Sequence, residues 1–142
     1  MLLAPEEYLG DLPPTEFTDG LPAFNDFENS AWKIGERVRQ TFVDHPQLRK
    51  NSDLVQKVLE AALCKNLRRG RQSFVMALAF VGARPHAAEL ANCLDDPDIN
   101  GHVIDTLLKM KATGHAHRVR PLLNSDKAWI RRLANRYINR YP

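Results

Sequence analysis

The sequence predicts an all-α fold in which short helices stack into a solenoid, and three observations lead to this prediction. Apolar residues recur at helical spacing in about seven segments between residues 31 and 142. Proline or glycine separates most of these segments. In addition, a pattern repeats at an offset of 29 residues, where Leu94-Asp95-Asp96 aligns with Leu123-Asn124-Ser125 and Phe74 with Val103. Periods of this size are typical of stacked helical pairs.

Length and composition favour a single cytoplasmic domain. The 142 residues suffice for one domain with an adequate core. No apolar run reaches membrane-spanning length, and the first ten residues lack the basic and apolar regions of a secretory signal. Cys64 and Cys93 lie in apolar helical stretches. Buried reduced thiols are therefore favoured over a disulfide, as in intracellular proteins.

Residues 1–30 are predicted to form an acidic, proline-rich arm. They contain seven acidic residues, four of the nine prolines and no lysine or arginine. Residues 31–142 contain all 20 lysines and arginines against ten acidic residues. The arm is also too apolar for a free disordered tail, so we expect it to pack irregularly along the basic body and cap its first hydrophobic face. Alternatively, the arm or the basic face meets a charged partner.

The first three helices are expected between residues 30 and 81. Ser30 is a good N-cap for the first helix, which stops at Asp44-His45-Pro46. The second starts at Ser52 or Asp53, carries a clean apolar stripe, and is closed by the basic run 65–71. The third, 73–81, is apolar on every side and is therefore expected at the centre of the fold.

Four further helices are expected after Gly82. Pro85 is followed by a short helix that ends at Leu94, and a core helix around residues 103–108 is ended by Gly114. The helix 117–123 tolerates its proline only in the first turn. Asp126 is expected to cap a last helix with a long apolar face, formed by Trp129, Ile130, Leu133, Ala134, Tyr137, Ile138 and Tyr141.

Aspartate-proline turns followed by spaced apolar residues carry a resemblance to a known repeat family. The matching residues are Asp96-Pro97-Asp98, Val103, Leu107, Gly114, Val119, Pro121, Leu122, Leu123, Asp126, Ile130, Arg131 and Ala134. Residues 70–142 thus resemble HEAT repeats, particularly the short variety first noted in phycobilisome lyases, and the earlier helices do so only loosely. The pattern departs at Asp105-Thr106, where the family often has Arg and Ala. The resemblance implies a short right-handed HEAT-like solenoid at 31–142, behind an arm at 1–30.

No group of residues points to catalysis, a cofactor or a metal. His115 and His117 would point about 200° apart at a helix start, so they cannot easily share one ion. The carboxylates at 95, 96 and 98 are what an interhelical turn requires. Asp105, beside the core stripe of its helix, is a better candidate for a special role, and Trp129 is expected on the packing face. We therefore expect a protein that is not an enzyme.

Basic residues are the main functional signal. Arginines at 132, 136 and 140 form one stripe on the last helix, and further basic residues at 109, 111, 118 and 120 and at 68, 69 and 71 extend a ridge. We expect partner-binding residues in this ridge and in the acidic arm: Arg118, Arg120, Arg132, Arg136, Arg140, Glu6, Glu7 and Asp11.

These features favour a non-catalytic protein-binding module. Size and architecture resemble those of small HEAT-like bacterial immunity proteins, which bind and block a toxin or effector domain, with electrostatics speeding capture. Two alternatives stay open. The basic ridge is also compatible with a nucleic-acid-binding repeat protein. An adaptor or subunit of a larger assembly would instead show a large exposed apolar patch on the last helix.

Overall fold

The computed structural model describes residues 17–18, 21–22, 26–81 and 84–142. Seven α-helices lie in this part of the chain, which confirms the predicted helical body: α1 (Asp26–Asp44), α2 (Ser52–Leu63), α3 (Gln72–Leu78), α4 (Arg84–Ala91), α5 (Asn100–Lys109), α6 (Ala116–Val119) and α7 (Ala128–Arg140). The connections include the 3-10 helices η2 (Pro46–Lys50), η3 (Lys65–Arg71) and η4 (Arg120–Asn124). In the arm, the two-residue strands β1 (Phe17–Thr18) and β2 (Leu21–Pro22) pair antiparallel.

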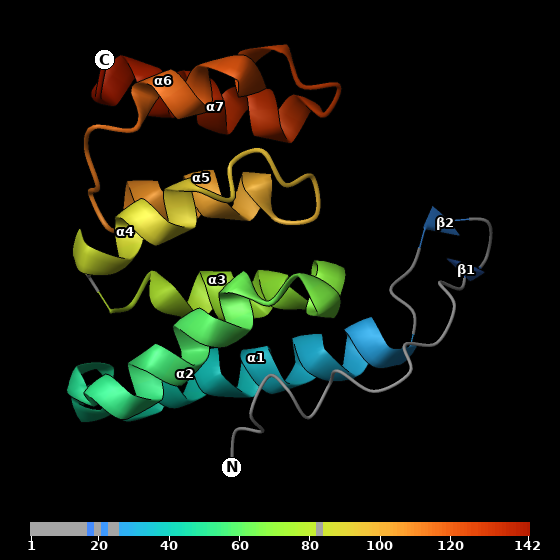
Figure 1. Ribbon diagram of the computed structural model, residues 1–142, viewed down its shortest axis with the longest axis vertical. Coiled ribbons are helices and arrows are strands. Elements are labelled where there is room, and N and C mark those ends of the chain that lie inside the picture. Colours follow the sequence, from blue (N-terminus) through green and yellow to red (C-terminus); the bar gives the residue numbers. More distant parts are fainter. Residues whose placement is uncertain (1–16, 19–20, 23–25, 82–83) are drawn as a thin grey trace.

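The helices stack in successive levels, with α1 and α7 at opposite ends (Figure 1). Helix α1 packs on α3, α3 on α5, and α5 on α7. We call these four helices the odd layer. On its other side, α2 packs against α3, α4 against α5, and α6 with η4 against α7. None of the described helices combines the length and the apolar character needed to cross a membrane.

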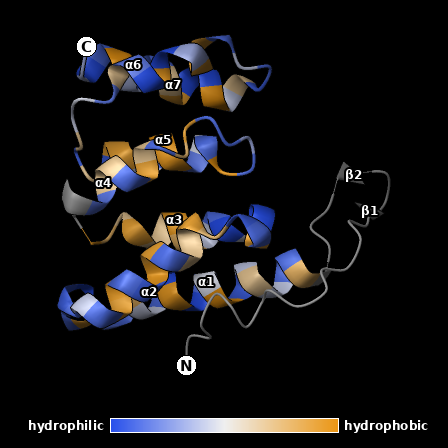
Figure 2. Cartoon of the chain, in the orientation of Figure 1, coloured by the Kyte–Doolittle hydropathy of each residue, from blue (hydrophilic) through white to orange (hydrophobic). Residues whose placement is uncertain are grey.

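Helix α3 forms the centre of the core, as its sequence predicts. It contacts α1, α2 and α5, and Phe74, Val75 and Leu78 are fully buried. Apolar residues predominate on α3 and α5, whereas the level of α6 and α7 is more hydrophilic (Figure 2). The helix ends at Leu78 rather than at Val81, and the segment that follows is only half-buried. The apolar residues 79–81 therefore pack at a turn and do not extend the helix.

Two predicted helix starts are wrong, the first because of a contact far along the chain and the second because of a local hydrogen bond. Ser30 lies inside α1, which begins at Asp26. Its first turn contains Glu28, whose carboxylate accepts hydrogen bonds from the backbone N–H of Arg69 at 3.0 Å and from its Nε at 3.2 Å. The N-cap of α7 is Lys127 and not Asp126, and the Lys127 N–H donates to Ser125 Oγ at 3.2 Å. The predicted helix 117–123 is divided into α6 and η4, so that its proline lies in the first turn of η4.

The basic run 65–71 does not close α2, because it forms a separate 3-10 segment. Helix α2 ends at Leu63, and η3 follows with a kink at Arg68, where φ is 51° and ψ is −130°. A positive φ is costly for a residue with a Cβ, so the surrounding contacts must hold this conformation. The kink turns the chain from α2 into α3 and sends the neighbouring arginines inward.

The Tyr137 hydroxyl links α7 to the loop before α6 by two hydrogen bonds. The hydroxyl donates to the Ala112 carbonyl at 2.6 Å and accepts from the His115 N–H at 3.2 Å. Tyr137→Phe should lower the free energy of unfolding by about 2 kcal/mol in urea denaturation, because it leaves two backbone groups without partners. Tyr141→Phe is the control, since no hydrogen bond from that hydroxyl occurs in the described residues. Equal stabilities of the two variants would contradict the prediction.

Candidate functional site

Three arginines form an exposed row on α7. Arg132, Arg136 and Arg140 are four residues apart and exposed. Their backbone positions are therefore about 6 Å apart along one side of the helix. None of them forms an ion pair with a described acidic residue. The Arg140 guanidinium lies 5.5 Å from the centre of the Tyr141 ring. The row thus presents three positive charges to solvent, as the sequence predicts.

Trp129 lies at the edge of the packing face of α7, next to the arginines. Its side chain is 39% exposed. The ring covers the surface of α5: its centre is 5.4 Å from the centre of the His102 ring, and an added Cβ at Gly101 would lie 2.2 Å from Trp129 Cη2. Since Arg132 and Arg136 follow Trp129 by three and seven residues, the indole begins the arginine row.

Helix α5 contributes a second, nearly neutral row. His102, Asp105 and Lys109 follow one another by three and four residues, and the first contacts Trp129. Asp105 pairs with Lys109 at 2.9 Å, so this carboxylate has an ordinary surface partner. Burial lowers the pKa of His102 against the opposing effect of Asp105, so the ring is neutral at pH 7. The α5–α7 face is the name used below for His102, Asp105, Lys109, Trp129, Arg132, Arg136 and Arg140.

The charge of this end of the chain is strongly positive. Residues 109–142 contain nine lysines and arginines and a single acidic residue, Asp126, a net charge of +8, whereas the whole chain carries +3. Helix α7 lies at the end of the odd layer, and no further helix of the described residues stacks beyond it (Figure 1). A concentrated, one-sided charge of this kind raises the rate of encounter with an anionic partner.

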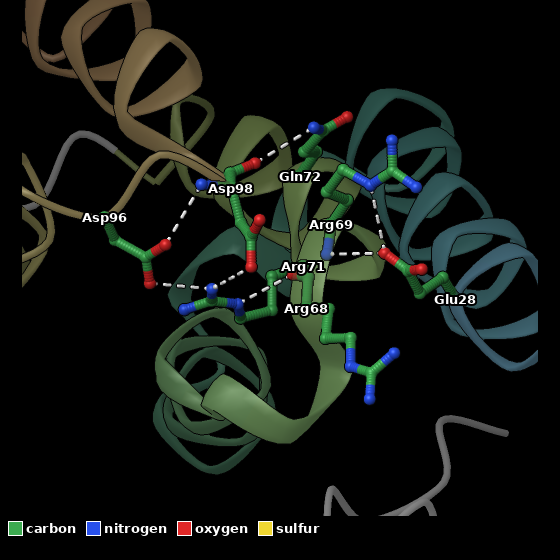
Figure 3. Close-up of polar contacts among 7 residues, drawn as sticks. All are labelled: Glu28, Arg68, Arg69, Arg71, Gln72, Asp96 and Asp98. Atoms are coloured by element: carbon green, nitrogen blue, oxygen red, sulfur yellow. Dashed lines mark hydrogen bonds and ion pairs between the residues drawn. The ribbon is translucent and has the colours of Figure 1, made fainter. Parts of the chain in front are cut away.

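Two arginines of η3, Arg69 and Arg71, pair with acidic residues of the fold and do not extend the basic ridge. Arg71 is 1% exposed and lies between two aspartates: its Nη2 is 2.7 Å from Asp96 Oδ2 and 3.5 Å from Asp98 Oδ2 (Figure 3). Its Nε donates to the Arg68 carbonyl at 2.8 Å, and Arg69 pairs with Glu28 at 3.2 Å. These cations therefore hold α1, η3 and the α4–α5 loop together. Asp96 also has its predicted turn role, since its Oδ1 accepts the Asp98 N–H at 3.0 Å.

The remaining predicted binding residues lie apart from the row or outside the described residues. Arg118 is exposed and donates to Asn92 Oδ1, beside a groove of about 390 Å³ between the end of α4 and η4. Arg120 is exposed at the start of η4. The structure therefore places Arg118 against the α4 side of the stack, whereas Trp129 contacts α5. Glu6, Glu7 and Asp11 lie outside the described residues.

The described residues hold no cluster suited to a metal ion. No group of three histidine, cysteine or carboxylate side chains gathers within this part of the chain. Cys64 and Cys93 are free and half-buried. Burial raises the pKa of the Cys93 thiol, which keeps it protonated.

Comparison with protein-family models, with curated proteins and with solved structures finds no match to the chain. A role for the α5–α7 face therefore has to be inferred from its exposed side chains and charges. Sequence reasoning found its arginines but missed Trp129, although its spacing of three and seven from two of them was a usable signal.

Proposed function

We propose that the protein is a non-catalytic protein-binding module and that the α5–α7 face is its binding site. One observation carries the proposal: a partly exposed tryptophan begins a row of three arginines on the last helix of the stack, and none of the three forms an ion pair with a described residue. Tryptophan and arginine are the residues most enriched among energetically dominant interface positions. A ring that is packed on one side and open on the other offers apolar area at small entropic cost.

The stacking of the helices supports the architectural part of this proposal. Helices of the odd layer follow one another as neighbours, and α3, α5 and α7 each contact a helix on the other side, as in a solenoid whose units bury one another. We therefore propose a short right-handed solenoid of the HEAT-like kind. Such repeats act mainly through extended surfaces, and the end of the stack is one of these surfaces.

Within this proposal, the chain binds another protein and blocks it, as an immunity protein blocks a toxin or effector domain. The one-sided charge favours fast capture, and the aromatic contact then slows release. A partner with an acidic patch next to an apolar depression fits this face.

The test compares two charge-reversed variants of the tagged full-length chain. The first carries Arg132→Glu, Arg136→Glu and Arg140→Glu. The matched control carries Lys33→Glu, Arg37→Glu and Lys57→Glu, three exposed positions on α1 and α2 that form no ion pair in the described residues and give the same change in net charge. Circular dichroism verifies that both variants fold.

A single protein should co-purify with the wild type and the control in constant stoichiometry, and calorimetry with the purified partner should give a Kd in the nanomolar range. The α7 variant should bind at least 100-fold more weakly, since it replaces attraction by repulsion at three positions. Recovery of only weak, promiscuous proteins would count against the proposal. Recovery of nucleic acid whose binding weakens steeply with salt would favour the nucleic-acid alternative instead.

A further inference from the structure

We infer that the α5–α7 face takes an acidic α-helix of its partner, with three carboxylates spaced by four residues and an apolar residue three positions beyond the row. This inference rests on the proposed function and adds the chemistry and conformation of the segment that is bound. It follows from the spacing of the arginine row, from the satisfied backbone of α7 and from the position of Trp129.

The spacing of the charges fits a helix. Arg132, Arg136 and Arg140 repeat every four residues, about 6 Å along the axis of α7. Glutamates at every fourth residue of a second helix repeat with the same rise, so three pairs form when the two helices lie nearly parallel or antiparallel. Guanidinium and carboxylate groups also match in the planar, two-bond geometry that makes such pairs specific.

The backbone of the site also favours a helical occupant. An extended peptide needs main-chain partners, which a receptor supplies at an open sheet edge. Helix α7 uses its own amide and carbonyl groups in helical hydrogen bonds, and the strands β1 and β2 belong to the arm, far along the chain. A helix brings its own backbone hydrogen bonds and offers only side chains. Among acidic segments, a helix therefore leaves the fewest backbone groups without hydrogen bonds when it docks to this face.

The apolar contact lies at one end of the arginine row. Trp129 stands three residues before Arg132 and rests against neutral His102. An aliphatic or aromatic side chain three residues from the carboxylate that pairs with Arg132 reaches this ring pair. This side chain follows the last carboxylate in an antiparallel helix and precedes the first one in a parallel helix.

A nucleic acid fits the surroundings of the row less well. Beyond α7, two cations of the odd layer are paired with neighbouring acids: Arg39 pairs with Glu36 at 2.9 Å and Lys109 with Asp105 at 2.9 Å. A backbone of phosphates gains affinity from a track of uncompensated cations and is repelled by carboxylates along the way. A short row of three arginines beside a tryptophan instead matches a single acidic helix.

The experiment uses the full-length chain with Trp32→Phe, so that Trp129 is the only tryptophan and reports binding by its fluorescence. The probe is an end-capped, alanine-based helical peptide with glutamates at i, i+4 and i+8 and leucines three positions beyond each end of that row. The control peptide has the same composition and helicity, with the glutamates distributed around the helix. A single-stranded oligonucleotide of equal charge is the third ligand.

The ordered peptide should change the Trp129 fluorescence and bind at least ten-fold more tightly than the rearranged peptide. Arg132→Glu/Arg136→Glu/Arg140→Glu should abolish this binding, and Lys33→Glu/Arg37→Glu/Lys57→Glu should leave it within two-fold. Equal binding of both peptides, tighter binding of the oligonucleotide, or no binding of the ordered peptide would each overturn the inference. If a partner protein is nevertheless captured in an α7-dependent way, the proposed function stands and only the acidic helix is wrong.

Discussion

Replacing Arg71 by methionine is expected to lower the free energy of unfolding by about 3–5 kcal/mol, the cost of breaking a buried ion pair from one side. The substitution leaves Asp96, whose side chain is only 15% exposed, without its partner at 2.7 Å. It also removes the donor to the Arg68 carbonyl at the kinked residue of η3. Methionine keeps most of the side-chain volume, so the loss reports charge and hydrogen bonding more than packing. Urea denaturation monitored by circular dichroism measures it.

Two further variants isolate the pair. Arg120→Met removes an exposed arginine of η4 and should change stability by less than about 0.5 kcal/mol. The double variant Arg71→Met/Asp96→Asn should regain part of the loss, because it no longer buries an unmatched carboxylate, and a double-mutant cycle gives the coupling. A loss below about 1 kcal/mol for Arg71→Met alone would show that the network in Figure 3 does not hold the fold together.

Gly35→Ala is expected to destabilise the protein by about 3 kcal/mol, at the upper end of what overpacking costs. Gly35 lies where α1 crosses α3, and an added Cβ would stand 2.0 Å from Ser73 Oγ and 2.9 Å from the Phe74 backbone nitrogen. The clash also disturbs the hydrogen bond from Ser73 Oγ to the Trp32 carbonyl, 2.7 Å long. On an exposed helix the same change would instead stabilise by about 0.5–1 kcal/mol.

A loss of stability in Gly35→Ala therefore indicates a close helix crossing, whereas a gain indicates an ordinary exposed helix position. Gly35→Ala/Ser73→Gly removes the side-chain half of the clash and should recover part of the stability, while the contact with the backbone nitrogen of α3 remains. Thermal and urea unfolding of the single and double variants test this. If Gly35→Ala raises the stability, α1 does not approach α3 as closely as the structure indicates.

The helical body and its core could be predicted because both depend on local spacing. Val103, Ile104 and Leu107 recur at helical intervals and are fully buried, and the apolar run at 74–78 is the centre of the stack. Periodicity reports which side of a helix is apolar, whatever covers it. The exposed arginines of α7 could be predicted for the same reason, since a polar row opposite an apolar one must face solvent.

The roles of individual polar and aromatic residues could not be predicted in this way. Arg71 looks like its neighbours in the basic run, yet its partners lie 25 and 27 residues further along the chain. Glu28 belongs to the acidic arm by composition, and its contact with Arg69 spans 41 positions. Trp129 looks like a core residue until α5 supplies Gly101 and His102 beneath one side of its ring. Composition shows whether such a residue is charged or aromatic, but it does not show which residue it contacts.

The seven helices, the buried apolar rows and the outward arginines of α7 thus follow from residue spacing, because a helix decides locally which side chains share a side. Which cations are free was decided by tertiary structure alone. Helix packing brings Asp96 and Asp98 to Arg71 and Glu28 to Arg69, and it brings no acid to Arg132, Arg136 or Arg140 among the described residues. Coulomb interactions act over a few ångströms in space, whatever the separation in sequence. For that reason the candidate site became a short row beginning at Trp129 instead of a ridge along the whole body.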